Sequence, residues 1–429
     1  MTSNFRATFA FDLRHPHEED RLATFALPRA LIALLLGAFL ALPGSPTSAA
    51  TVNDFLATLT ADQAQEFERW RAAKIHFDRR LDAYWYQIES KRKDRRPKRA
   101  GGQLYAAEDY VWTFPPEYEG PPLAPDLRRR YEAFLAAAQQ QEQTPTPERE
   151  VPGVDDFLAA AKQHYNFVPS RIPERDFKRR YAQEAVALGL TKDEVVRVYA
   201  LETGGLGTAD MQAGVNPVTR KGKPISSALG YAQLLHANTI GELIKHGDVF
   251  VSRLRTMAAT AQDPDRVREL RAKIASLQAM QRAARSVPDD WYRHVAFAQT
   301  PRGYGMHAIN LDGDIGPWLQ SSKLQGLKDF AAKKGVTNLS GEEIELMNLA
   351  GPATGIEMIQ PVGLTAPTPN FFSRRAYYVN KMVTGKTSAE LLAEFTRRMD
   401  QSSQKTGSVE FAQAFDEVHR QGQERLPWR

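Results

Sequence analysis

The stretch TKDEVVRVYALETGG, residues 191–205, has the signals of one complete helix that ends in a carboxylate. Thr191 and Glu194 form a capping-box pattern at its start, and Gly204 supplies the glycine that commonly ends a helix. Apolar side chains recur at helical spacing in between, at Val195, Val198 and Tyr199. Glu202 continues this stripe in the last turn, so its side chain is expected to face the core.

A carboxyl group in that position has unusual acid–base properties. Partial burial raises the pKa of a carboxyl group, and the negative end of the helix dipole acts in the same direction. We therefore expect Glu202 to keep a proton near neutral pH and to be able to donate it, as a catalytic acid does. The alternative is a solvated helix-end glutamate, or one neutralised by an arginine.

The composition is that of an ordinary globular protein. The 429 residues, 42% hydrophobic and 25% charged, are enough for two or three domains. The excess of 56 basic over 51 acidic residues is mild and does not indicate a nucleic-acid partner. Zero cysteines exclude disulfides and thiolate metal sites, and the nine histidines form no close ligand pair, so we expect no structural zinc.

The beginning of the chain has the pattern of an export signal. Arg29 precedes an apolar run at 30–42, and small residues follow up to Ala50. We expect residues 1–50 to be a signal peptide, cleaved after Ala49 or Ala50, and the mature protein to be periplasmic or secreted. The alternative is a retained membrane anchor, for which the apolar run is short.

The region 51–143 has a helical pattern that contains a strongly basic run. Apolar residues within 52–90 predict two helices, and a further helix is expected from about 125 to 143. The run KRKDRRPKR at 91–99 is expected to be a basic loop, either a solvated connection or an attachment to an anionic envelope polymer or phospholipid surface. Prolines mark 144–153 as a linker. The region before it is a candidate surface for an envelope protein partner.

Beyond the linker, no segment alternates apolar and polar residues for long enough to predict a sheet. Helices are expected at about 154–165 and 174–188, and a charged helix at 263–286 is expected to form an exposed hairpin arm. Residues 401–429 are taken as a C-terminal tail. The sequence thus predicts a mainly α protein. The absence of glycine-rich nucleotide motifs and of a G-x-S-x-G elbow argues against nucleotide enzymes and serine hydrolases.

Two further segments carry polar residues at fixed spacing. In SSALGYAQLL, residues 226–235, the residues Ser227, Gly230 and Gln233 form an S-x-x-G-x-x-Q pattern. In GEEIELMNLAGP, residues 341–352, Asn348 lies near the end of an expected helix, closely followed by Ala-Gly-Pro. Together with Glu202, these ordered segments resemble the lytic transglycosylases, which cleave bacterial cell-wall glycan and have a lysozyme-like fold.

The resemblance implies a lysozyme-like catalytic domain over 154–400, with a helical insertion at about 240–335. It implies that Glu202 protonates the oxygen between N-acetylmuramic acid and N-acetylglucosamine, then removes the proton of the muramyl C6 hydroxyl to give a 1,6-anhydro product. No metal or cofactor is consumed. The peptidoglycan strand is the partner, and the substrate-binding residues are expected at Ser227, Gly230, Gln233 and Asn348.

One feature of the family is missing. A tyrosine commonly precedes the motif asparagine, but here Met347 precedes Asn348; aligned on Ala-Gly-Pro instead, Asn348 and Leu349 stand in place of Tyr-Asn. Candidates to replace this tyrosine, and further substrate-binding residues, are Tyr231, Tyr377 and Tyr378.

The segment DGDIGPW at 312–318 is a conspicuous turn. Trp318 is a candidate for sugar contact, and Asp312 and Asp314 are candidates for a second active-site carboxylate or part of a calcium loop. Two alternative functions stay open. One is a hydrolytic muramidase on the same fold, which the missing motif tyrosine leaves possible. The other is a non-catalytic protein that binds or assembles the cell wall. The sequence leaves oligomeric state and endo or exo action open.

Overall fold

The computed structural model describes residues 52–142 and 150–424. These residues form helices and turns with isolated bridges such as Gln212 to Leu229, and no strand, so the prediction of a mainly α protein is confirmed for them. The expected signal peptide at 1–50 and most of the expected linker lie outside the described residues. Within the described residues, no helix combines the length and apolar character needed to cross a membrane.

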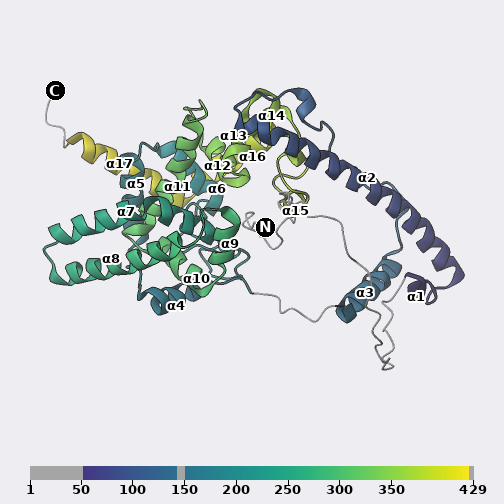
Figure 1. Ribbon diagram of the computed structural model, residues 1–429, viewed down its shortest axis with the longest axis horizontal. Helices are drawn as coiled ribbons and strands as arrows, with labels where there is room; N and C mark the ends of the chain where they lie inside the picture. Colours follow the sequence, from purple (N-terminus) through teal and green to yellow (C-terminus); the bar gives the residue numbers. More distant parts are fainter. Residues whose placement is uncertain (1–51, 143–149, 425–429) are drawn as a thin grey trace, which may run out of the picture. The chain divides into compact units, whose positions relative to one another are not determined.

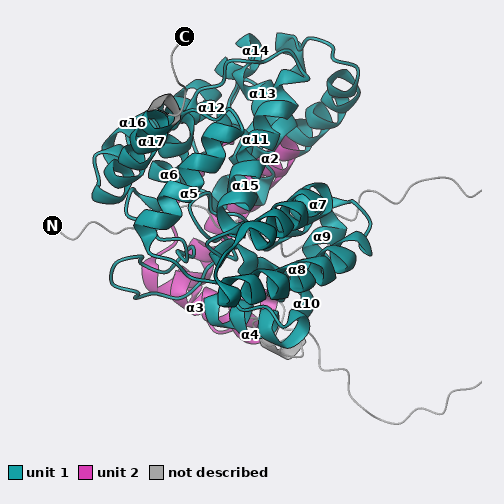
Figure 2. Cartoon of the chain, turned by 90° about the vertical axis from the view of Figure 1, so that its left-hand side faces the viewer, with its two compact units in different colours: residues 1–12, 86–114, 150–429 teal, residues 13–85, 115–149 magenta. Residues whose placement is uncertain are grey.

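The chain divides into two compact units, which Figure 2 distinguishes by colour. Unit 1 comprises the described residues of 86–114 and 150–429, and unit 2 those of 13–85 and 115–149. The division falls inside the long helix α2 (Ala61–Ala100). The segment 86–114, which we expected to belong to a helical N-terminal region, thus clusters with the residues that follow the linker.

Unit 2 is a small helical unit with an aromatic core. It contains α1 (Val52–Leu56), the first part of α2 and α3 (Pro125–Glu142). Phe55 and Phe67 pack edge to face with ring centroids 5.0 Å apart, and Tyr131 of α3 contacts both rings. The helices predicted from the apolar spacing are confirmed here.

Unit 1 contains the remaining helices, labelled in Figure 1. They are α4 (Val154–Tyr165), α5 (Glu174–Ala187), α6 (Lys192–Thr203), α7 (His236–Thr260), α8 (Pro264–Arg285), α9 (Trp291–Ala298), α10 (Pro301–His307), α11 (Ile315–Ala332), α12 (Gly341–Ala350), α13 (Pro352–Ile359), α14 (Pro361–Thr365), α15 (Arg374–Val379), α16 (Ser388–Ser403) and α17 (Thr406–Glu424). Short 3-10 turns lie at Ala107–Asp109, Ala308–Leu311 and Thr368–Asn370.

The helix α6 has the ends that its sequence predicts. The Thr191 hydroxyl accepts a hydrogen bond from the Glu194 amide, and the Glu194 carboxylate accepts one from the Thr191 amide, at 3.2 and 2.7 Å. At the other end Gly204 adopts φ 62°, a left-handed conformation that glycine reaches without steric cost. Helices α12, α16 and α17 pack against α6, so its last turn lies inside unit 1.

The basic run 91–99 is helical, and the expectation of a loop there is wrong. One side of the helix is buried, because Arg95 is 1% exposed and donates to the Glu357 carboxylate at 2.7 Å. Arg95 also donates to the carbonyls of Asp109 and Asn370, and Arg99 contacts the second oxygen of Glu357. A buried cation needs such partners, and they fix this part of α2 within unit 1.

Helices α7 and α8 lie side by side as a long hairpin (Figure 1). The helix predicted at 263–286 is confirmed, but it is not a fully exposed arm. Leu270, Leu277 and Met280 are buried in the main core of unit 1, while charged residues such as Arg268 stay exposed. The expected C-terminal tail is also part of the core, since α17 buries Phe411 and Phe415.

Candidate functional site

Glu202 lies in the last turn of α6 and is 6% exposed. Its stripe partners Val195, Val198 and Tyr199 are buried with it, as the helical spacing predicts. Burial raises the pKa of Glu202 well above its ordinary value, and a neighbouring carboxyl group adds to the shift. Glu202 is therefore neither a solvated helix-end glutamate nor, among the described residues, the partner of an arginine.

Two side chains of α12 meet Glu202. The Asn348 amide donates to Glu202 Oε1 at 3.0 Å and lies 3.5 Å from Glu345 Oε2. The Glu345 carboxyl group is fully buried and lies within hydrogen-bonding contact of Glu202. The packing of α12 on α6 thus forms a cluster of two carboxyl groups bridged by one amide, which we call the Glu202 cluster.

The Glu202 cluster has fewer hydrogen-bond donors than carboxyl oxygens that can accept a hydrogen bond. Glu202 Oε2 and Glu345 Oε1 are buried and accept no hydrogen bond from any described group. Two ionised carboxylates in contact without a cation are strongly unfavourable in a buried site. Burial raises the pKa of Glu345 to about 8. Both shifts favour the protonated forms of the two carboxyl groups, and a proton between them would supply the missing donor.

Sequence reasoning identified Asn348 but missed Glu345. A signal for it exists, because Glu345 precedes Asn348 by three residues and so occupies the same face of α12. Its neighbours Ile344, Leu346 and Met347 are all buried, which marks this glutamate as an acid within an apolar segment. Only the packing of α12 against α6 shows that this acid meets Glu202.

The S-x-x-G-x-x-Q segment forms a buried turn whose polar groups bond locally. Gln233 has φ 42°, and its amide donates to the Gly230 carbonyl at 2.7 Å and to the Met211 carbonyl at 3.2 Å. The Ser227 hydroxyl lies 2.5 Å from His236 Nδ1. The structure thus brings Ser227, Gly230 and Gln233 together in one turn, and Asn348 to Glu202, but shows no hydrogen bond between the two groups.

Gly230 is required by this turn. Its φ is 80°, and a Cβ atom added to it would lie 2.5 Å from the side-chain nitrogen of Gln320. Gln320 in turn accepts a hydrogen bond from the Ala232 amide at 3.1 Å. The glycine of the motif therefore serves the close approach of α11 to this turn.

The three candidate tyrosines lie in different surroundings. Tyr231 is buried, and its hydroxyl donates to the Glu174 carboxylate at 2.5 Å. The Tyr377 hydroxyl accepts a hydrogen bond from the Gly385 amide at 2.8 Å, and Tyr378 is 39% exposed. The residues found beside Glu202 are Asn348, which donates to its carboxyl group, and Glu345.

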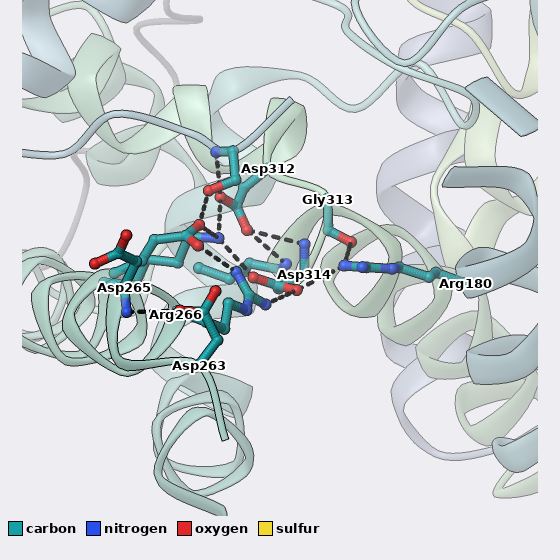
Figure 3. A network of polar contacts seen from close by, with 11 residues as sticks. Arg180, Asp263, Asp265, Arg266, Asp312, Gly313 and Asp314 are labelled. Atoms are coloured by element: carbon teal, nitrogen blue, oxygen red, sulfur yellow. Dashed lines mark hydrogen bonds and ion pairs between the residues drawn. The ribbon is translucent and has the colours of Figure 1, made fainter. Parts of the chain in front are cut away.

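Asp312 and Asp314 belong to a network of ion pairs, drawn in Figure 3. Lys273 of α8 is 3% exposed, and its Nζ lies 2.9 Å from Asp312 and 2.5 Å from Asp314. Arg266 and Arg180 each donate to Asp314 at 2.6 Å (Figure 3). Both carboxylates are therefore paired with Lys273 or the two arginines, and neither is a free second carboxylate. The described residues also contain no cluster of side chains that could hold a metal ion, so no calcium loop is found here.

Trp318 and the cavity found in unit 1 lie apart from the Glu202 cluster. Trp318 packs against Phe250, with ring centroids 5.9 Å apart, and the Arg253 guanidinium lies 5.4 Å from its ring. A cavity of about 350 Å³ is lined by residues of α4 and α8, by Ser286 and by Arg302 of α10, and none of them is a predicted site residue.

Compared with known proteins, the chain gives no significant match to a family model, a curated protein or a solved structure.

Proposed function

We propose that the protein is a peptidoglycan lytic transglycosylase in which Glu202 is the acid and base. The observation that carries the proposal is the state of Glu202, a buried carboxyl group with a raised pKa, at the end of a helix and bonded by Asn348. Both residues belong to the motifs that carry the sequence resemblance. A protonated glutamate at neutral pH is the group that glycosidic cleavage requires.

In this reaction Glu202 gives its proton to the oxygen between the two sugars, and the bond from that oxygen to the muramyl C1 atom breaks. The Asn348 amide already donates to Oε1, so it stabilises the carboxylate that results. That carboxylate then takes the proton of the C6 hydroxyl while the C6 oxygen bonds to C1. The acid is restored, and neither water nor a cofactor is consumed.

The arrangement of acids favours this chemistry over a hydrolase with two independent carboxylates. Such hydrolases separate the two groups by about 5–9.5 Å, so that a sugar or a water fits between them. Glu345 lies within hydrogen-bonding contact of Glu202, and Asp312 and Asp314 are paired with Lys273. A single acid assisted by the N-acetyl group of the substrate needs no second carboxylate.

The rest of the proposal follows from the same resemblance. We infer a lysozyme-like catalytic domain in unit 1, with α7 and α8 within an insertion, and export of the protein to the compartment that contains peptidoglycan. The N-terminal region 51–143 is the candidate surface for an envelope partner.

Digestion of purified cell-wall sacculi, with the products identified by mass spectrometry, tests the function. We expect 1,6-anhydromuramyl products from the parent protein and at least a 100-fold loss for Glu202→Gln, an effect on the order of that found for general acids. Glu343→Gln is the matched control, because it makes the same change on α12 at a residue that caps the helix.

The products also separate the alternatives. Reducing muramic ends instead of anhydro ends would identify a hydrolytic muramidase. Binding to sacculi with no cleavage by parent or variant would reject the enzyme in favour of a wall-binding protein.

A further inference from the structure

We propose that Glu345 is a positioning residue that holds a proton in common with Glu202 and supplies a hydrogen bond to the Glu202 carboxylate once it has given up its own proton. Geometry carries this inference. The two carboxyl groups are in contact, both are buried, and each has one oxygen without a donor. Asn348 bridges their other oxygens from a single amide nitrogen, at 3.0 and 3.5 Å.

Among the described residues, no ion pair joins a cation to Glu202 or Glu345. Helix α12 contains no lysine or arginine, and the two cations of α6 are paired elsewhere, Arg197 with Glu342 and Asp400 and Lys192 with Asp416. On neighbouring helices, Lys328 pairs with Glu194, Lys178 with Glu410, and Arg397 and Arg398 with Glu394. Glu202 and Glu345 therefore face each other alone, and protons are what neutralise them.

The charge of the pair explains the use of a second acid. With both groups protonated the pair is neutral, and the loss of one proton to the substrate leaves a single negative charge. The proton that stays on Glu345 can then bond to the Glu202 carboxylate, which removes the need for a cation beside it. If Glu345 were ionised at the outset, the same step would leave two negative charges in contact in a buried site.

This assignment rests on the proposed function only for its catalytic consequence, because the shared protons are a property of the protein without substrate. Infrared titration of the full chain measures protonated carboxyl groups directly. Asp312 and Glu174 also have raised pKa values, so spectra are taken as differences between variants that leave those two groups unchanged.

In the difference between the parent and the double variant Glu202→Gln, Glu345→Gln, we expect two protons lost in separate steps, the first near pH 8 and the second at a higher pH. In Glu345→Gln the remaining acid loses its proton in one step, and the high-pH step disappears. In Glu202→Gln the same is expected of Glu345, so the test survives if one variant does not fold. Glu343→Gln is expected to keep both proton steps of the pair. A parent that loses both protons in one step, or below about pH 6, would overturn the assignment.

A kinetic test separates positioning from a structural role. Glu345→Gln keeps a side chain that can donate a hydrogen bond, so its kcat should stay within about tenfold of the parent value. Glu345→Leu removes the donor, so its kcat should be lower by a further tenfold or more, with little change in KM. Equal losses in the two variants would contradict the role. If the parent cleaves no glycan while the two proton steps are present, the proposed function fails and the shared pair stands.

Discussion

Replacement of Lys273 by methionine should destabilise unit 1 strongly, because it removes the cation from a buried set of acids. Lys273 Nζ contacts Asp314, Asp312 and Glu269 at 2.5, 2.9 and 3.0 Å. Asp314 keeps Arg266 and Arg180, but Asp312 is 0% exposed and keeps only hydrogen bonds from the backbone amides of residues 170, 314 and 315. Breaking a buried pair in this way costs about 3–5 kcal/mol.

The cost should depend on pH through Asp312. Burial raises the pKa of Asp312 even in the presence of Lys273, and the loss of Lys273 raises it further. A carboxyl group with a raised pKa in the folded state destabilises that state as the pH rises above the unfolded value, because it is forced to ionise. The deficit of Lys273→Met relative to the parent should therefore be largest near pH 8 and shrink toward pH 5.

Hydrogen exchange with mass spectrometry, on peptides from α8 and α11, measures this deficit within unit 1 of the full chain. The matched control is Arg268→Met on the same helix, where the partner is Asp265 and both side chains are more than 70% exposed. That control should change stability by less than about 1 kcal/mol. A Lys273→Met deficit below about 1 kcal/mol, or one that grows toward pH 5, would refute the reasoning.

Two further predictions concern the turn and the Glu202 cluster. Gly230→Ala should lower the free energy of unfolding by about 1–3 kcal/mol, because the residue has φ 80° and the added methyl group meets Gln320. The shift in the thermal unfolding midpoint measures this loss. The control is Gly326→Ala, where no atom lies within 4 Å of the added methyl group. The pKa of Glu345 is about 8 in the folded protein, against an ordinary carboxyl pKa of 4.5. The contribution of Glu345 to folding stability should therefore fall as the pH rises between these values, by up to about 1.4 kcal/mol per pH unit. Denaturation of Glu345→Gln over the same pH range should show a smaller fall in stability.

The sequence predicts those parts of unit 1 that depend on local signals. The ends of α6 follow from Thr191, Glu194 and Gly204, which act on residues no more than four positions away. The burial of Glu202 follows from the apolar stripe of the same helix. The boundaries of α4 and α5 are local in the same sense and were predicted to within a residue.

The basic run 91–99 could not be predicted in this way. Seven basic residues in nine indicate a solvated segment unless an acid is supplied from elsewhere. Here that acid is Glu357, which lies 262 residues from Arg95 in the sequence. Glu345 was missed for a related reason, since its acidity matters only when α12 packs against α6.

Two buried pairs of acids in unit 1 show why residue type alone does not identify the site. Asp312 and Asp314 meet Lys273, Arg266 and Arg180, and the network ties α8 to the start of α11. These cations lower the pKa of Asp314, so Asp314 stays charged, whereas burial raises the pKa of Asp312 even beside Lys273. Glu202 and Glu345 meet the amide of Asn348 and no cation in the described chain, and burial raises both pKa values, which favours the protonated forms. An acid can transfer a proton at neutral pH only in the second setting. The presence or absence of a cation beside each pair therefore separates the candidate catalytic group from the structural one, and it depends on contacts between distant parts of the chain.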